Sequence, residues 1–181
     1  LSCMSVSRKA WKLVDAAKCP RYYFDLTLYR KALEDDDTPF TSSVSLVVAL
    51  DEALKVVLAT GVADVLKRCQ TMAQATRAGV EAMGLSLFAK RPSNAVTAVK
   101  VPAGVDGKQL TKLMYDQSKV MVAGGQGEMA GKIFRFAHMG YISPEDVLAG
   151  FAALEQTLGT LNYRFTSGSG VKAAQAILQQ P

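Results

Sequence analysis

Two long helical patterns dominate the middle of the chain. Residues 44–59 are apolar at almost every position and carry few charged side chains. A helix that is apolar on nearly every side is packed between neighbours, so we expect this one to be buried. Gly61 separates it from a second predicted helix over residues 62–83, which is polar along one side. Gly84 follows, as is common just beyond a helix C-terminus.

Shorter elements are predicted before these helices. Residues 1–7 alternate weakly between apolar and polar and lead into a helical pattern over residues 8–14. This pattern predicts a strand followed directly by a helix, as at the edge of a larger α/β sheet. A short helix is expected over residues 26–33, with Asp25 as its N-cap and the acidic run 34–37 at its end.

Beyond residue 84 the pattern changes to short strands and amphipathic helices. A strand-strand-helix-strand-strand-helix order indicates a compact α+β domain with its helices on one face of the sheet. Serine followed by proline and two acids is a strong helix start. The predicted elements are strands at 85–88 and 95–101, a helix capped by Asp106, strands at 120–122 and 132–136, and a helix starting at Ser143-Pro144 and running to Leu161.

These changes in pattern divide the chain into four predicted segments. Residues 1–60 resemble the edge of a larger α/β domain, and residues 61–84 form a linking helix. Residues 85–165 form the small α+β domain. The remaining residues 166–181 start with a serine- and glycine-rich run, which predicts a flexible tail with a weak helix.

Composition limits the function classes. The chain is 49% apolar and 20% charged, which is typical of a globular protein. No apolar run approaches the ~20 residues of a membrane span. Three cysteines (Cys3, Cys19 and Cys69) in no metal-ligand spacing predict a cytoplasmic protein with free, mostly buried thiols. The net charge of +5 is scattered along the chain, which argues against a nucleic-acid surface.

A run of hydroxyl-bearing residues precedes the predicted buried helix. Residues 38–44 are Thr-Pro-Phe-Thr-Ser-Ser-Val. Free N–H groups, hydroxyls and the helix dipole together favour a phosphate at a helix N-terminus. An ordinary N-cap is the alternative, and spacing alone favours the cap.

A second candidate lies in the predicted strand 132–136. A glycine-rich loop, residues 124–127, precedes this strand and matches neither a dinucleotide-binding nor a P-loop pattern. Arg135 lies in an otherwise apolar stretch, where an arginine needs a partner, and its planar fork suits a carboxylate. A structural ion pair and a clamp for a ligand carboxylate both stay open. His138, the one histidine of the chain, is expected to be a hydrogen-bonded structural residue.

Taken in order, several segments resemble one enzyme family. The chain is similar to the fold-type I, class V pyridoxal-phosphate aminotransferases of the alanine–glyoxylate and serine–pyruvate type. The resemblance covers about residues 1–162. It rests on the segments 21–25 (RYYFD), 38–41 (TPFT), 49–54 (ALDEAL), the glycine loop and 131–140 (GKIFRFAHMG).

The resemblance implies a fold and a set of site residues. The expected fold is α/β: the C-terminal α+β domain of the pyridoxal-phosphate transferase fold, with a remnant of the large cofactor-binding domain in residues 1–60. Thr41 would contact the phosphate of pyridoxal 5'-phosphate across a homodimer interface, and Thr38 would share this role. Arg135 would bind the substrate α-carboxylate. The lysine that holds the cofactor in this family precedes Leu1, so the chain is expected to be a C-terminal piece that is not catalytic alone.

The implied reaction moves an amino group from a small amino acid, alanine or serine, to glyoxylate or another 2-oxo acid. Two alternatives remain. Some relatives are named as the small, tritium-exchange subunit of a soluble hydrogenase, but hydrogen chemistry needs nickel or iron with cysteine ligands, which the scattered cysteines do not supply. A non-catalytic dimerisation or binding module is the other alternative.

Overall fold

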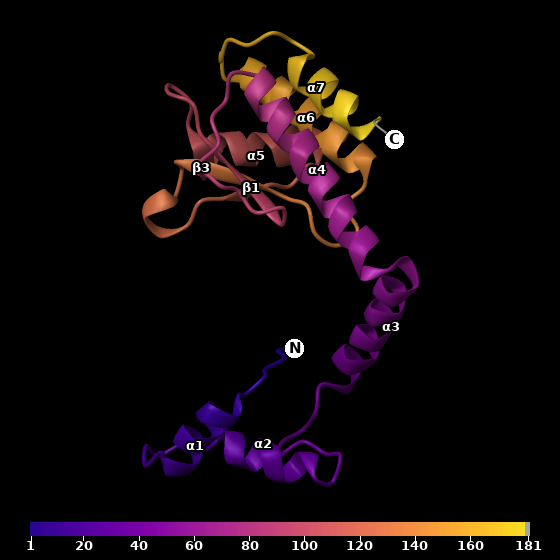
Figure 1. Cartoon of the computed structure of the whole chain (residues 1–181). Coiled ribbons are helices and arrows are strands. Elements are labelled where there is room, and N and C mark those ends of the chain that lie inside the picture. Colours follow the sequence, from indigo (N-terminus) through magenta and orange to yellow (C-terminus); the bar gives the residue numbers. More distant parts are fainter. Residues whose placement is uncertain (180–181) are drawn as a thin grey trace. The chain divides into compact units, whose positions relative to one another are not determined.

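A computed structural model describes residues 1–179 and divides the chain into two compact units, Leu1–Thr60 and a second one from Gly61 onward. The first unit is helical, whereas the second combines helices with a small sheet (Figure 1). Mixed helix and sheet agree with the predicted fold class. None of the helices among residues 1–179 has the length and apolar character needed to cross a lipid bilayer.

The first unit begins with two short helices that are capped and tied together locally. Helix α1 spans Arg8–Ala16 and helix α2 spans Leu26–Leu33. Asp25 is the N-cap of α2, as predicted, and accepts a hydrogen bond from the Thr27 N–H at 3.0 Å. The Arg21 guanidinium donates both to Asp25 and to carbonyls at the end of α1, so one side chain joins the two helices.

The strand predicted at residues 1–7 is absent, because these residues have no regular structure before α1. A strand needs a neighbouring strand for its backbone hydrogen bonds, and every strand of the part described here lies in the second unit. The helix that was predicted next is confirmed, two residues longer than expected.

Helix α3 spans Val44–Thr60 and confirms the predicted helix, but none of its residues is buried. Val44 is 67% exposed and Leu58 72% exposed. Burial had been expected from the apolar character of nearly every side. Within the unit Leu1–Thr60 no element covers these apolar sides, so α3 presents them openly.

The second unit is built from four helices, a short 3-10 turn and a three-stranded sheet within the described residues. The sheet is antiparallel, with strand order β1-β3-β2. The elements are α4 (Val62–Ala82), β1 (Val96–Lys100), α5 (Gly107–Ser118), β2 (Ala123–Gly124), η1 (Gly127–Met129), β3 (Ile133–Ala137), α6 (Pro144–Thr160) and α7 (Ser169–Leu178).

One hydrophobic core holds the second unit together. Phe134 and Val99 bring the sheet into it, and Phe151 of α6 is fully buried at its centre. Gly79 of α4 approaches the Phe151 ring so closely that an added Cβ would lie 2.4 Å from it. This close approach sets the spacing of α4 and α6, because any side chain at position 79 would occupy the volume of the ring.

The helix starts agree closely with the sequence. Asp106 caps α5 by accepting hydrogen bonds from the N–H groups of Lys108 and Gln109. Ser143 and Asp146 form a capping box at the start of α6. These helix caps depend on residues only two or three positions apart, which is why the sequence pattern predicted them.

Two of the predicted strands are shorter or displaced. The segment 85–88 forms only a bridge between Leu87 and Val99, supported by backbone hydrogen bonds on either side. Regular pairing on the other edge begins at Ala123, so the strand predicted at 120–122 starts three residues later.

The prediction that the thiols are mostly buried is wrong for two of the three cysteines. Cys3 and Cys19 are exposed, and Cys69 is buried.

The helix predicted in the tail is present at the end of the described chain, and it packs against the rest of the second unit. Helix α7 lies along α4 and α6 (Figure 1), and Gly170 approaches the Met83 sulfur so closely that an added Cβ would lie 2.6 Å from it. The Glu155 carboxylate accepts hydrogen bonds from the first N–H groups of α7. Residues 180 and 181 of the predicted tail lie outside the described residues.

Candidate functional site

The first candidate site surrounds Arg135 on β3. In the sheet register Arg135 is paired with Ala98 of β1 on one side and with Ala123 of β2 on the other. The side chain of each neighbour is a single methyl group. They leave room beside the guanidinium, although Arg135 itself is half-buried.

The guanidinium of Arg135 has few partners. One Nη2–H donates to the Gly124 carbonyl at 2.8 Å. The Nε atom is buried without a hydrogen-bond partner, and no carboxylate in residues 1–179 lies within 4.0 Å of the guanidinium. The structural ion pair left open by the sequence is therefore not found in the described part of the chain. A buried donor without a partner is costly, and a ligand carboxylate would relieve that cost.

Arg135 lines a cleft of about 580 Å³ in the second unit. Its walls are mostly apolar and come from the segment between α5 and β2, from β3 and from the start of α6. Lys119 adds a second positive charge, while Asp146, the one acid in the lining, already accepts a hydrogen bond from the Ser143 N–H. The charge balance of the cleft favours an anionic ligand with a short apolar part.

His138 lies one residue beyond β3 and is 2% exposed. Its Nε2 is 2.8 Å from the Thr97 hydroxyl, and its backbone N–H donates to the Ala95 carbonyl. Burial, with a smaller contribution from the positive charge of Arg77, lowers the pKa of His138 from 6.5 to about 4. His138 is thus a neutral, hydrogen-bonded structural residue near pH 7, as the sequence predicted.

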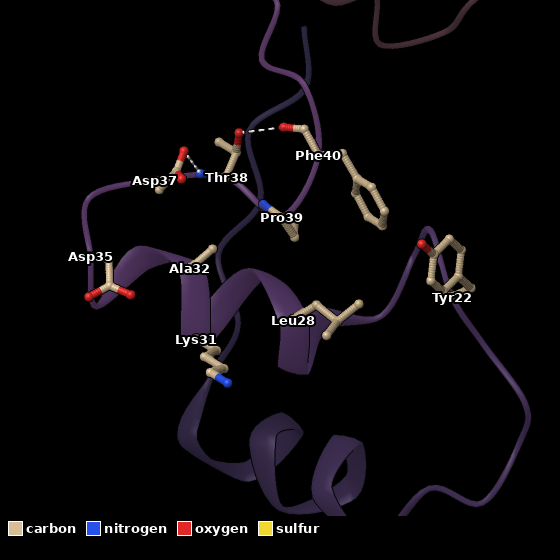
Figure 2. A pocket seen from close by; sticks show the side chains of 9 residues that line it. All are labelled: Tyr22, Leu28, Lys31, Ala32, Asp35, Asp37, Thr38, Pro39 and Phe40. Atoms are coloured by element: carbon tan, nitrogen blue, oxygen red, sulfur yellow. Dashed lines mark hydrogen bonds between the residues drawn. The ribbon is translucent and has the colours of Figure 1, made fainter.

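The second candidate site is the segment before α3. Figure 2 shows the Thr38 hydroxyl directed at the Phe40 carbonyl, to which it donates at 2.7 Å. The Ser42 hydroxyl lies 2.6 Å from the Thr38 hydroxyl oxygen and donates to it, because the one hydroxyl proton of Thr38 already points to the Phe40 carbonyl. Both bonds hold Thr38 within its own loop.

A hollow of about 470 Å³ lies beside this loop. Pro39 and Phe40 form one wall and α2 the other, and the Tyr22 ring meets Phe40 edge to face at 5.4 Å (Figure 2). Thr41 does not line it. The Thr41 side chain is exposed directly before α3, and its hydroxyl makes no hydrogen bond to a described residue. Of the two threonines, Thr41 is the one whose hydroxyl is available to a ligand.

The sequence did not indicate every member of the Arg135 site. Gly124 was assigned only to a loop, and Ala98 and Ala123 were not singled out. Their importance depends on strand register, and register is set by contacts between segments far apart in the chain. Within residues 1–179, no three His, Cys, Asp or Glu side chains gather in a way that could hold a metal ion.

The chain matches no protein-family model, but it is similar to curated proteins and solved structures. It is 41% identical over 181 residues to a Synechococcus protein named "Soluble hydrogenase, small subunit", covering 98% of this chain and 47% of that protein. It is 33% identical over 183 residues to the L-aspartate–glyoxylate aminotransferase of Paracoccus denitrificans, with coverages of 99% and 46%. The pyridoxamine–pyruvate aminotransferase structure from Mesorhizobium loti matches with a TM-score of 0.89 and 36% identity, covering 96% of this chain and 46% of that one.

The chain thus spans about half the length of the curated relatives it matches. Sequence and structure point in the same direction, and the mixed helix-and-sheet fold matches the C-terminal region of these transferases. The resemblance inferred from the ordered motifs is confirmed. By sequence and by fold, the chain is similar to the C-terminal half of class V aminotransferases.

Proposed function

We propose that the chain is the carboxylate-binding, C-terminal part of a pyridoxal-phosphate aminotransferase. The complete enzyme would move an amino group from a small amino acid, such as alanine or serine, to glyoxylate or another 2-oxo acid. The observation that carries the proposal is Arg135, a half-buried arginine between two alanines that has no acidic partner in residues 1–179.

Arg135 would bind the α-carboxylate of the substrate. A guanidinium offers five N–H donors, and the Gly124 carbonyl accounts for one of them. Amino acid and 2-oxo acid both carry a carboxylate at the same position, so one arginine can orient both. The small apolar walls of the cleft suit a short substrate side chain.

Thr41 would contact the phosphate of pyridoxal phosphate. The chemistry of the segment fits this group, since Thr41, Ser42 and Ser43 provide hydroxyls immediately before α3, where the helix dipole also favours an anion. Thr38 would support this arrangement through its bonds to Phe40 and Ser42. When bound, the cofactor supplies the electron sink for amino-group transfer.

The remaining parts would come from a longer protein. We propose that the lysine that holds the cofactor precedes Leu1 in the complete sequence, and that the enzyme is a cytoplasmic homodimer. Residues 1–60 would then belong to the cofactor-binding domain, and its other segments would cover the open sides of α3. Sequencing the coding region upstream of Leu1 tests this part directly, because it must encode a domain with that lysine.

The test of Arg135 is its replacement by lysine in the complete enzyme. Lysine keeps the charge but loses the two parallel hydrogen bonds of the fork. Loss of about 2–4 kcal/mol of substrate and transition-state binding should lower kcat/KM roughly 30- to 1000-fold, with KM raised for amino acid and 2-oxo acid alike. The visible absorbance of the cofactor should not change.

Arg91→Lys is the matched control, since Arg91 is exposed and makes no hydrogen bond to a described residue. A lower melting temperature with unchanged KM in Arg135→Lys would mean a structural role and would remove the main support for the proposal.

A further inference from the structure

The orientation of the Arg135 guanidinium depends on a backbone carbonyl of the preceding glycine turn. The Gly124 carbonyl accepts the hydrogen bond from Nη2 at 2.8 Å and is the one acceptor that Arg135 meets among residues 1–179. The alanines that flank Arg135 in the sheet cannot hold the side chain by hydrogen bonds. The direction of the fork therefore follows the position of Gly124.

Gly124 is in turn held by its neighbour Gly125. The Gly125 N–H donates to the Ile133 carbonyl at 2.9 Å and so ties the turn to β3. The Met129 carbonyl closes over Gly125 from the other side, and an added Cβ would lie 2.0 Å from that oxygen. The two atoms nearest to such a Cβ are the carbonyl oxygen and carbon of Met129, which are backbone, so a rotamer change cannot accommodate a side chain at position 125.

The turn itself is closed by local bonds. The Met129 N–H donates to the Gln126 carbonyl, and the Ala130 N–H donates to the Gly127 carbonyl. The Lys132 N–H donates to the Met129 carbonyl. This small, self-bonded loop keeps the Met129 carbonyl in place against Gly125. A substitution at Gly125 must therefore move either the loop or the β2 edge, and the β2 edge carries the Gly124 carbonyl.

We propose that Gly125 is a positioning residue for substrate binding: its lack of a side chain keeps the Gly124 carbonyl where it aims the Arg135 fork into the cleft. The proposal rests on the proposed role of Arg135 in binding carboxylates. Gly125 does not touch the substrate. It acts through the hydrogen bond between Gly124 and Arg135, and so affects ligands that carry a carboxylate more than ligands that do not.

The test is Gly125→Ala in the complete enzyme, with Gly159→Ala on α6 as the control. A Cβ at Gly159 meets no atom within 4 Å, so this control makes the same chemical change in open space. Misplacing a positioning group can cost on the order of 100-fold, and we expect KM for the amino acid and the 2-oxo acid to rise roughly 10- to 100-fold in Gly125→Ala. We expect kcat to change much less and the absorbance of the cofactor to stay the same.

Two further measurements separate positioning from a general structural effect. The first is the dissociation constant of the neutral amide of a 2-oxo acid divided by that of the acid itself, a ratio that should fall towards one in Gly125→Ala and stay unchanged in Gly159→Ala. The second is a double-mutant cycle with Arg135→Lys, in which Gly125→Ala should add little once the fork is gone. Full additivity of the two changes, or an unchanged ratio, overturns the proposal.

The outcomes also separate this proposal from the proposed function. If Arg135→Lys raises KM but Gly125→Ala does not, the role of Gly125 is wrong and that of Arg135 stands. If Arg135→Lys leaves KM unchanged, both are wrong. Should Gly125→Ala fail to fold, a crystal structure of the native enzyme with a bound carboxylate inhibitor decides: the bond from Nη2 to Gly124 must persist, and a fork turned away from Gly124 refutes the proposal.

Discussion

Glu155 offers a sharp test of how α7 is attached to the second unit. One oxygen of its carboxylate accepts from the Gly168 N–H at 2.6 Å, and the other accepts from Gly170 and Val171 at 2.9 and 3.2 Å. These N–H groups have no partner within the helix, because they belong to its first turn or precede it. Glu155→Gln keeps the shape of the side chain but leaves one oxygen and removes the charge.

The expected loss follows from these three bonds. Hydrogen bonds to a charged group contribute about 1.5–3 kcal/mol each, those to a neutral group about half of that, and a donor left facing an amide nitrogen costs about 1–3 kcal/mol more. Because Glu155 is only half-buried, water compensates part of this loss. We expect Glu155→Gln to lower the free energy of unfolding of the second unit by about 2–3 kcal/mol.

Urea unfolding followed by circular dichroism measures this free energy, and amide hydrogen exchange at Gly170 and Val171 reports the cap itself. Exchange at these two amides should speed up in Glu155→Gln before the rest of the unit is affected. Glu81→Gln is the control, since Glu81 is exposed on α4 and its carboxylate makes no hydrogen bond to a described residue. Neutral surface substitutions change the free energy of unfolding by up to about 0.5 kcal/mol. A free energy of unfolding of Glu155→Gln within about 0.5 kcal/mol of the native value, together with unchanged amide exchange, would refute the proposed role of Glu155.

Two more predictions concern the core. His138 should make stability depend on acid: its pKa is lowered from 6.5 to about 4 in the folded state, so between these values the unfolded state binds the proton and the folded state does not. The contribution of His138 to the free energy of unfolding is complete above about pH 6.5 and falls by about 3 kcal/mol at most as the pH drops to 4. The free energy of unfolding, measured in urea, should therefore change less between pH 7 and pH 4.5 in His138→Gln than in the native protein. An equal change in both proteins would contradict this role of His138. Gly79→Ala should destabilise the second unit by about 1–3 kcal/mol, because the new methyl group overlaps the Phe151 ring. Gly79→Ala combined with Phe151→Leu should recover part of the loss in the same assay, and no recovery would mean that the clash is not the cause.

The sequence predicted those elements whose limits depend on nearby residues. Asp25, Asp106 and Ser143 each cap a helix through bonds that reach two or three residues along the chain. The start of each of these helices could therefore be located before any contact between distant segments was known.

The features that the sequence did not predict depend on contacts between segments far apart in the chain. Helix α7 was expected to be a weak helix in a flexible tail because its glycine- and serine-rich start carries no cap of its own; the cap is Glu155, thirteen or more residues earlier. The Arg135 site could be suspected from one arginine among phenylalanines. Its neighbours Ala98 and Ala123 follow only from the pairing of three strands.

The packing of α7 against α4 also has a consequence for synthesis on the ribosome. Gly170 of α7 fits against Met83, at the end of α4, and against Phe151 of α6, so this corner of the core is complete only once residue 170 has left the exit tunnel. At about 5–20 residues per second, α4 emerges several seconds before its partner is made. During that interval Met83, and later also Phe151, lacks the contact that Gly170 of α7 provides. Chaperone binding should therefore fall sharply when translation passes α7, and a stop codon placed before Ser169 should leave a product that quality-control proteases remove.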